Sequence, residues 1–273
     1  MYAFPLYDFR ANWSIAFCVL LIRYFIIAGG AFFLTVKLFK NKWAHKKIQQ
    51  RAPKSSIIEM EISSSILSFV IFAAMMALVI ILRQMGYTKI YVDAGARGYW
   101  YLPVSFLMLL FIHDTYFYWV HRGLHLPVLY KTIHVHHHRS KSPTPWAAFS
   151  FHPLEAVVEF IFMIPLVLVV PVHIVVLMIF AVAMTAMNVM GHLGYELFPA
   201  GFLRRPAGKL FNTTTHHDMH HHYTRYNFGL YFNIWDRLMK TNHPKYGEQF
   251  EKTASASPPG PVSPSDIVVD PAE

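Results

Sequence analysis

Long apolar stretches constrain the folding of this chain more than any other feature of its sequence. Residues 14–36 and 62–82 are predominantly apolar, and each is long enough for a helix to cross about 30 Å of hydrocarbon. A soluble domain carries roughly a quarter charged residues, whereas 14% of these 273 residues are charged and 55% are hydrophobic. The sequence therefore predicts an integral membrane protein, in which helices satisfy the backbone polar groups.

Basic residues beside the first apolar span indicate the orientation of the chain. Seven Lys and Arg residues fall within 37–54, whereas only Arg10 precedes the span. Because basic loops stay in the cytosol, we predict a cytosolic 37–54 segment and an external N-terminus. The N-terminus lacks a cleavable-signal pattern, so we expect the span to be retained. Arg23 lies within it, where an arginine is often functional, but we favour a snorkelling side chain or a later helix start.

The next two apolar spans carry the chain out and back. Span 62–82 returns outward, and we place the loop at 83–98 outside the membrane. A third span, at 101–120, comes back in and delivers His121 to the cytosolic end.

The apolar stretch 156–190 is too long for one span and short for two complete ones. Pro165 and Pro171 interrupt it, which favours a helical hairpin with the prolines near its turn. A hairpin returns the chain to the cytosolic side, where the later histidines can meet the earlier ones. The predicted fold class is an all-α integral membrane protein with about four to five transmembrane helices, hairpin included, and a cytosolic histidine-rich helical cap.

Composition divides the chain into three regions. Residues 1–100 hold the N-terminal transmembrane helices and the basic cytosolic loop, and residues 101–252 form a histidine-rich region that we predict to be catalytic. Residues 253–273 are rich in Pro, Ser and Ala, and we expect a disordered tail.

Cysteine count and net charge exclude several classes of protein. A single cysteine, Cys18, rules out an internal disulfide and argues against a cysteine-based zinc or iron–sulfur site. A net charge of +9 could indicate nucleic-acid binding, but the basic residues cluster beside apolar spans. That distribution is typical of a membrane surface, so we expect no nucleic-acid partner.

Three histidine clusters follow the apolar spans. Their members are His121 and His125, then His134, His137 and His138, and finally His217, His220 and His221. Residues three and four apart share a helix face, so each cluster is predicted to present its imidazoles to one point. Neutral imidazole binds divalent transition metals, and eight such ligands are too many for one ion. We therefore predict two metal ions held between helices, with redox or hydrolytic chemistry.

Carboxylates near these clusters are candidates for the same site. Asp114 shares a helical stripe with His121 and could orient a ligand by accepting its other ring N–H. Glu196 lies four residues after His192, so it could be a metal ligand or an acceptor behind one, and we favour the acceptor. Asp218 could support a neighbouring imidazole.

The other histidines fall outside the predicted ligand set. His136 points away from the shared face of its cluster, so we expect it to support a ligand or to lie exposed. His152 precedes Pro153, where helix is disfavoured, and should organise a loop. The remaining ones flank the clusters or have no partners in sequence: His45, His113, His173, His216, His222 and His243.

An ordered set of motifs over residues 112–241 resembles the fatty acid hydroxylase/sterol desaturase superfamily of membrane di-iron enzymes. It comprises HDxxFYWxHRxxH at 113–125, LYKTIHVHHH at 129–138, PTPWAAFSFHPLE at 143–155, GHLGYELFP at 191–199, TTTHHDMHHH at 213–222 and NFGLYFNIWDRL at 227–238. The sterol desaturase branch is nearer, because fatty acid 2-hydroxylases have HxxxH where this chain has His192 and Glu196.

The resemblance implies a di-iron site that uses O2 and two electrons to hydroxylate or desaturate a C–H bond of a sterol or fatty acyl lipid. Its implied iron ligands are His121, His125, His134, His137, His138, His192, His217, His220 and His221. An external donor such as a b-type cytochrome or ferredoxin is expected, because the chain lacks the GxGxxG fingerprint. The site would face the cytosol from a bacterial inner membrane or the endoplasmic reticulum.

Two other functions remain open from the residues. Imidazole also suits zinc and copper, so a zinc-dependent lipid hydrolase is an alternative. A metal transporter is a less favoured one, because transporters place their ligands at mid-membrane, whereas these clusters follow the ends of spans. The sequence does not distinguish hydroxylation from desaturation.

Overall fold

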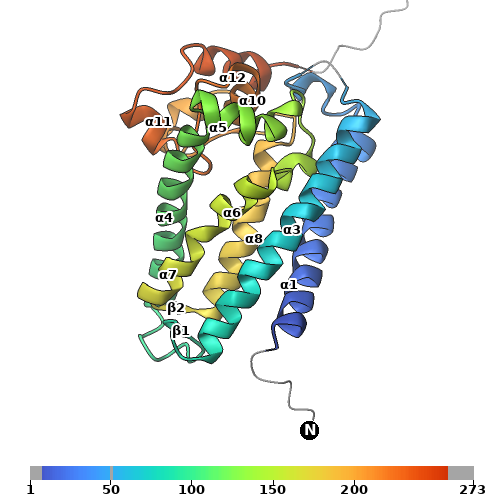
Figure 1. Ribbon diagram of the computed structural model, residues 1–273. Coiled ribbons are helices and arrows are strands. Elements are labelled where there is room, and N and C mark those ends of the chain that lie inside the picture. Colours follow the sequence, from blue (N-terminus) through green and yellow to red (C-terminus); the bar gives the residue numbers. More distant parts are fainter. Residues whose placement is uncertain (1–7, 50–51, 258–273) are drawn as a thin grey trace, which may run out of the picture.

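The computed structural model describes residues 8–49 and 52–257 as a bundle of long helices with a helical cap at one end (Figure 1). The long helices run roughly along one another (Figure 1). They are α1 (Phe9–Tyr24), α3 (Ser55–Gln84), α4 (Tyr101–Leu124) and α8 (Ile174–Gly191). Three short helical segments continue α1 without a break: the π-helical η1 (Phe25–Gly29), α2 (Gly30–Phe32) and the π-helical η2 (Phe33–Leu38).

Among the described residues, three helices are long and apolar enough to cross a membrane: Phe9–Leu38, Ser55–Gln84 and Ile174–Gly191. Side chains along the first of these, such as Val19, Ile22 and Ile26, are 55–68% exposed. Exposed aliphatic surface of this extent suits contact with lipid rather than water. The prediction of a helical membrane protein is therefore confirmed.

The first helix begins earlier than one interpretation of Arg23 assumed. The Asp8 carboxylate accepts hydrogen bonds from the backbone nitrogens of Arg10 and Ala11, at 2.9 and 3.2 Å, and starts the helix at Phe9. Arg23 therefore lies near the middle of the span Phe9–Leu38. A later helix start does not account for this arginine.

The third predicted span is α4, which is not one of the three membrane-length apolar helices. It has the necessary length, but it carries His113 and Asp114, both of them buried. Leu109 of α4 packs with Val167 and Phe180 in one core cluster. Burial inside the bundle allows α4 to hold polar side chains at a depth where lipid would not tolerate them.

The predicted hairpin is present. Its descending arm is α6 (Pro153–Ile161) followed by α7 (Met163–Val169), and its returning arm is α8. Pro171 lies at the turn, and Pro165 lies within α7. The turn leads into β2 (Val172–His173), which pairs in parallel with β1 (Ile90–Tyr91). This two-residue pairing is a small departure from the predicted all-α fold.

The cap gathers segments that are far apart in sequence at one end of the bundle (Figure 1). Its elements are η3 (Ala44–Lys46), α5 (Pro127–Thr132), η4 (His134–Arg139), η5 (Pro145–Phe149), η6 (Phe202–Arg204), α9 (Pro206–Leu210), α10 (Thr214–Tyr223), α11 (Ile234–Leu238) and α12 (Tyr246–Ala254). Of the tail predicted at 253–273, α12 includes the first two residues, and 258–273 lie outside the described residues.

The basic segment after the first span lies against this cap. Lys47 forms an antiparallel bridge with Tyr195, and the backbone nitrogen of Ile48 donates to the carbonyl of Gly194 at 3.0 Å. The start of α1 and the β1–β2 pair lie at the opposite end of the bundle (Figure 1). The basic loop and the histidines are thus on one side.

We expect reporter fusions to reproduce this arrangement. Fusions after Lys54, His138 and His222 should report the cytosol, because the seven basic residues of 37–54 fix the side of the cap. A fusion near Asp93 should report the opposite side. An alkaline phosphatase and green fluorescent protein pair measures both outcomes, and an external signal at His222 would contradict the topology.

Candidate metal centre

Nine imidazoles gather in the cap as two groups. Within each group, one nitrogen from every ring lies within 4.8 Å of the others. The first group is His121, His125, His134, His138 and His220, and the second is His137, His192, His217 and His221. Eight of the nine are buried, and His125 is half-buried. The structure thus brings together all nine histidines nominated from the sequence.

The helix-face pattern predicted that each HxxHH frame, at 134–138 and 217–221, presents its imidazoles to one point. The structure shows instead that each frame is divided between the two groups. His137 joins the second group while its neighbours in the frame join the first. Likewise, His220 joins the first group, whereas His217 and His221 join the second. On α10, residues four apart share a face and the residue between them turns aside. Each frame therefore links the two groups.

The ring nitrogens converge at distances that suit a metal ion. In the second group, the Nε2 atom of His192 lies 3.0, 3.3 and 3.4 Å from those of His217, His221 and His137. In the first group, four Nε2 pairs each lie 3.1 Å apart. Imidazole nitrogens at about 2.1 Å from one ion are separated by about 3.0–3.4 Å at octahedral or tetrahedral angles. Each group thus fits one ion.

Hydrogen bonds behind the rings fix which nitrogen is free to bind. The Nδ1 atom of His192 donates to the carbonyl of Asn188 at 2.8 Å, and that of His137 donates to the carbonyl of Ser150 at 3.3 Å. Because a carbonyl only accepts, both protons are on Nδ1, and the two Nε2 atoms face each other as lone pairs. Neither can donate to the other, so a cation between them is the natural partner.

The first group is supported in the same way. His121 donates from Nδ1 to the carbonyl of Phe228 at 2.8 Å, and His220 donates to the carbonyl of Tyr226 at 2.7 Å. The Nδ1 atom of His134 lies 2.7 Å from a carboxylate oxygen of Glu155. An acceptor behind the ring orients the ligand and raises its basicity.

Burial keeps the imidazoles of the cap neutral. Desolvation, followed by the charges of neighbouring rings, lowers the pKa of His138 to about 3. The same causes hold the pKa of His134, His217 and His221 well below the ordinary value. Neutral imidazole is the form that binds metal.

Asp114 does not contact an imidazole, which differs from its predicted position. Its carboxylate accepts hydrogen bonds from the backbone nitrogens of Tyr231 and Phe232, at 2.7 and 3.1 Å. Asp236 accepts from the backbone nitrogen of Phe228 at 2.9 Å. The two carboxylates thus hold the loop whose Phe228 carbonyl supports His121. Asp114 acts on the site through the backbone.

Glu196 is also placed differently from the prediction. The helix α8 ends at Gly191, and Gly194 has a φ of +74°, so Glu196 does not follow His192 on a helix. Its buried carboxylate accepts from the backbone nitrogen and hydroxyl of Thr215, at 3.0 and 2.7 Å. Burial raises the pKa of Glu196. Glu196 contributes no atom to either group and instead holds the first turn of α10.

The remaining candidates lie outside both groups. Asp218 accepts a hydrogen bond from Gln49 at 2.6 Å rather than from an imidazole. His136 meets the hydroxyl of Ser64 at 2.8 Å. The other histidines outside the groups are His45, His113, His152, His173, His216, His222 and His243.

Two carboxylates of the site were not identified from the sequence. Glu155 supports His134, and Asp236 holds the Phe228 loop. Glu155 is the one carboxylate of the 143–155 motif, and it follows the His-Pro pair that starts α6. A lone acidic residue in so apolar a stretch is a signal that could have identified it.

A helical membrane bundle with two buried histidine groups at one end defines the class of this protein, and comparisons with known proteins give the family. The model of the fatty acid hydroxylase family matches residues 106–241. This part of the chain belongs to that family, as the motifs predicted. No solved structure matches the chain significantly.

Curated relatives fall in the sterol desaturase branch. Lathosterol oxidase of Mus musculus is 35% identical over 67% of this chain and 58% of its own length, and that of Homo sapiens is 32% identical over the same shares. A Delta(7)-sterol 5(6)-desaturase of Leptosphaeria maculans is 28% identical over 83% of this chain and 59% of its length. The matches thus span less than two thirds of these relatives.

We predict that the purified protein binds about two transition-metal ions per chain, one per group. His221→Ala should empty the second group, because it removes a nitrogen that lies 3.2 Å from His217 and 3.3 Å from His192. His138→Ala should empty the first. Metal analysis of the folded variants measures this, with His45→Ala as the control. Full metal content in His138→Ala would contradict the ligand assignment.

Two buried glutamates should respond differently to the same substitution. Glu155→Gln removes the charge behind His134, and loss of such a partner typically costs about 10–100-fold in metal affinity or activity. Glu196→Gln should keep both ions at near-normal affinity, because its contacts are with Thr215 and Phe198. It should instead weaken α10 and lower the melting temperature. Equal metal loss in both variants would refute this division of roles.

Proposed function

We propose that the protein is a membrane di-iron, O2-dependent oxidoreductase that hydroxylates or desaturates a C–H bond of a sterol or fatty acyl lipid. The observation that carries this proposal is the convergence of nine neutral imidazoles into two linked groups at the end of a membrane bundle. Family membership favours iron over zinc or copper. When bound, the two iron ions would supply the activation of O2 for oxidation of the lipid.

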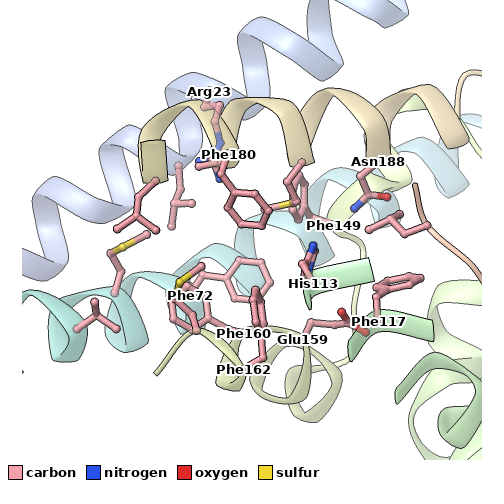
Figure 2. Close-up of a pocket in the computed structure, with 18 of the residues that line it drawn as sticks. Arg23, Phe72, His113, Phe117, Phe149, Glu159, Phe160, Phe162, Phe180 and Asn188 are labelled. Atoms are coloured by element: carbon pink, nitrogen blue, oxygen red, sulfur yellow. The ribbon is translucent and has the colours of Figure 1, made fainter. Parts of the chain in front are cut away.

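A cavity within the bundle (Figure 2) is lined in part by residues that contact a histidine of each group. Its wall includes Phe117, whose ring contacts that of His121 at 4.9 Å between centroids, and Phe151, whose ring contacts that of His137 at 5.4 Å. Phenylalanines make up much of the remaining lining. Such a wall accepts an apolar lipid, holds its C–H bonds beneath the histidines and excludes bulk water.

Electrons would come from a separate protein, for which a b-type cytochrome or ferredoxin is the proposed donor. The cap that carries both groups lies with the basic segment 37–49, so the donor would approach from the cytosol. We propose the endoplasmic reticulum or a bacterial inner membrane as the location. Sterol-desaturase relatives support a sterol as substrate class.

Comparative lipid mass spectrometry tests the reaction. Cells with and without the protein are grown with and without oxygen, and the His221→Ala variant is the control. We expect an oxygen-dependent product that has gained one oxygen atom or lost two hydrogen atoms. Turnover of a lipid ester without oxygen would favour the zinc hydrolase, and metal uptake without any lipid product would favour the transporter.

A further inference from the structure

The cavity beneath the histidine groups holds more polar chemistry than an apolar lipid requires. Four of its twenty lining residues are polar or charged: Arg23, His113, Glu159 and Asn188. Ionisable side chains at membrane depth are costly, and they commonly mark a binding site or pathway. The Asn188 side chain is accounted for, because its amide donates to the carbonyl of Ala148 at 2.5 Å.

His113 presents a hydrogen-bond donor to this cavity. Its Nδ1 atom lies 2.6 Å from the hydroxyl of Tyr231, which has no other hydrogen-bond partner among the described residues. The hydroxyl therefore donates to Nδ1, and the imidazole proton sits on Nε2. The ring stacks on Phe162, with 4.6 Å between centroids, and this contact fixes its plane. In Figure 2, His113 projects from α4 into the pocket.

Glu159 presents an acceptor to the same space. It precedes Phe162, the stacking partner of His113, by three residues, and both line the cavity. The hydroxyl of Tyr116 donates to the carbonyl of Val158 at 2.6 Å and joins α4 to α6 beside them. The carboxylate makes no hydrogen bond or ion pair with any residue in the described part of the chain.

We propose that His113 and Glu159 bind a hydroxyl group of a lipid that occupies this cavity. The hydroxyl oxygen accepts from Nε2 of His113, and its hydrogen is donated to the carboxylate of Glu159. A hydrocarbon would leave both groups unpaired in an apolar cavity, which is costly.

Arg23 is the remaining ionisable residue of the cavity wall. Arg23 lines the wall formed by α1 and makes no ion pair with a described residue. It is the fifteenth of the thirty residues in its span, so about 20 Å of helix separates it from either end. A carboxylate ligand would pair with Arg23, whereas an alcohol would use the donor of His113 and the acceptor of Glu159.

The position of His113 on α4 sets the distance between the bound hydroxyl group and the C–H bond that would be oxidised. His113 precedes His121 by eight residues on α4, which is about 12 Å along the helix. A hydroxyl bound at this depth places the reactive C–H bond several bonds away. This consequence rests on the proposed function, whereas hydroxyl binding itself does not.

Binding by the purified full chain tests the inference. The probe is tritiated cholesterol, displaced by matched lipids with and without a hydroxyl: cholesterol against 5-cholestene, and hexadecanol against hexadecane. We expect the wild type to prefer the alcohol of at least one pair by about tenfold. The pair that shows the preference distinguishes a sterol from a linear alcohol. Absence of preference in both pairs, or strongest displacement by palmitate that depends on Arg23, would overturn the inference.

Matched variants distinguish loss of hydroxyl binding from a general loss of folded structure. Glu159→Leu and His113→Phe should abolish the preference, whereas Glu159→Gln should keep most of it, because the amide oxygen still accepts. Glu59→Leu, at an exposed position of α3, is the control and should leave it unchanged. Metal content is measured on the same samples. Hydroxyl preference without bound metal would contradict only the proposed function, and full metal content without preference would contradict only the present inference.

Discussion

The arrangement of the cap depends on histidine rings whose unprotonated Nε2 atoms are held facing one another. Backbone carbonyls at Asn188, Ser150, Phe228 and Tyr226 take the Nδ1 protons of four rings and turn their bare Nε2 atoms toward shared centres. Such an arrangement is repulsive without a cation and favourable with one. A bound ion would stabilise the geometry that binds it, so we expect metal binding and folding of the cap to be coupled.

Carboxylates around the site act mainly on the backbone. Asp114 and Asp236 fix the loop that supplies the Phe228 carbonyl, and Glu196 fixes the first turn of α10. Only Glu155 among them meets a ligand ring directly. Their common effect is to position donors and acceptors within a fraction of an ångström, which a metal site requires and which loops alone do not provide.

Placing the histidine groups at the end of the bundle reconciles two incompatible environments. Nine polar rings need a cap in which backbone groups and carboxylates can satisfy them, whereas a lipid needs an apolar cavity. Phe117 and Phe151 contact both regions, since each lines the cavity and touches a histidine of one group. Asn188 also borders both regions, because it lines the cavity and its backbone carbonyl accepts a hydrogen bond from Nδ1 of His192.

Hydropathy and histidine spacing were sufficient to predict the membrane class, the proline-broken hairpin and eight of the nine histidines that gather, because these features depend on local composition and period. The family and the ninth histidine, His192, came from the resemblance of an ordered set of motifs. Tertiary structure decided which histidine joins which group, since His137 and His138 are neighbours in sequence but lie in different groups. It also decided the roles of Asp114, Glu196 and Glu155, because the partner of a carboxylate depends on which distant backbone or ring packs against it. Those contacts join residues that are far apart in the chain, so the local period of the sequence does not reveal them.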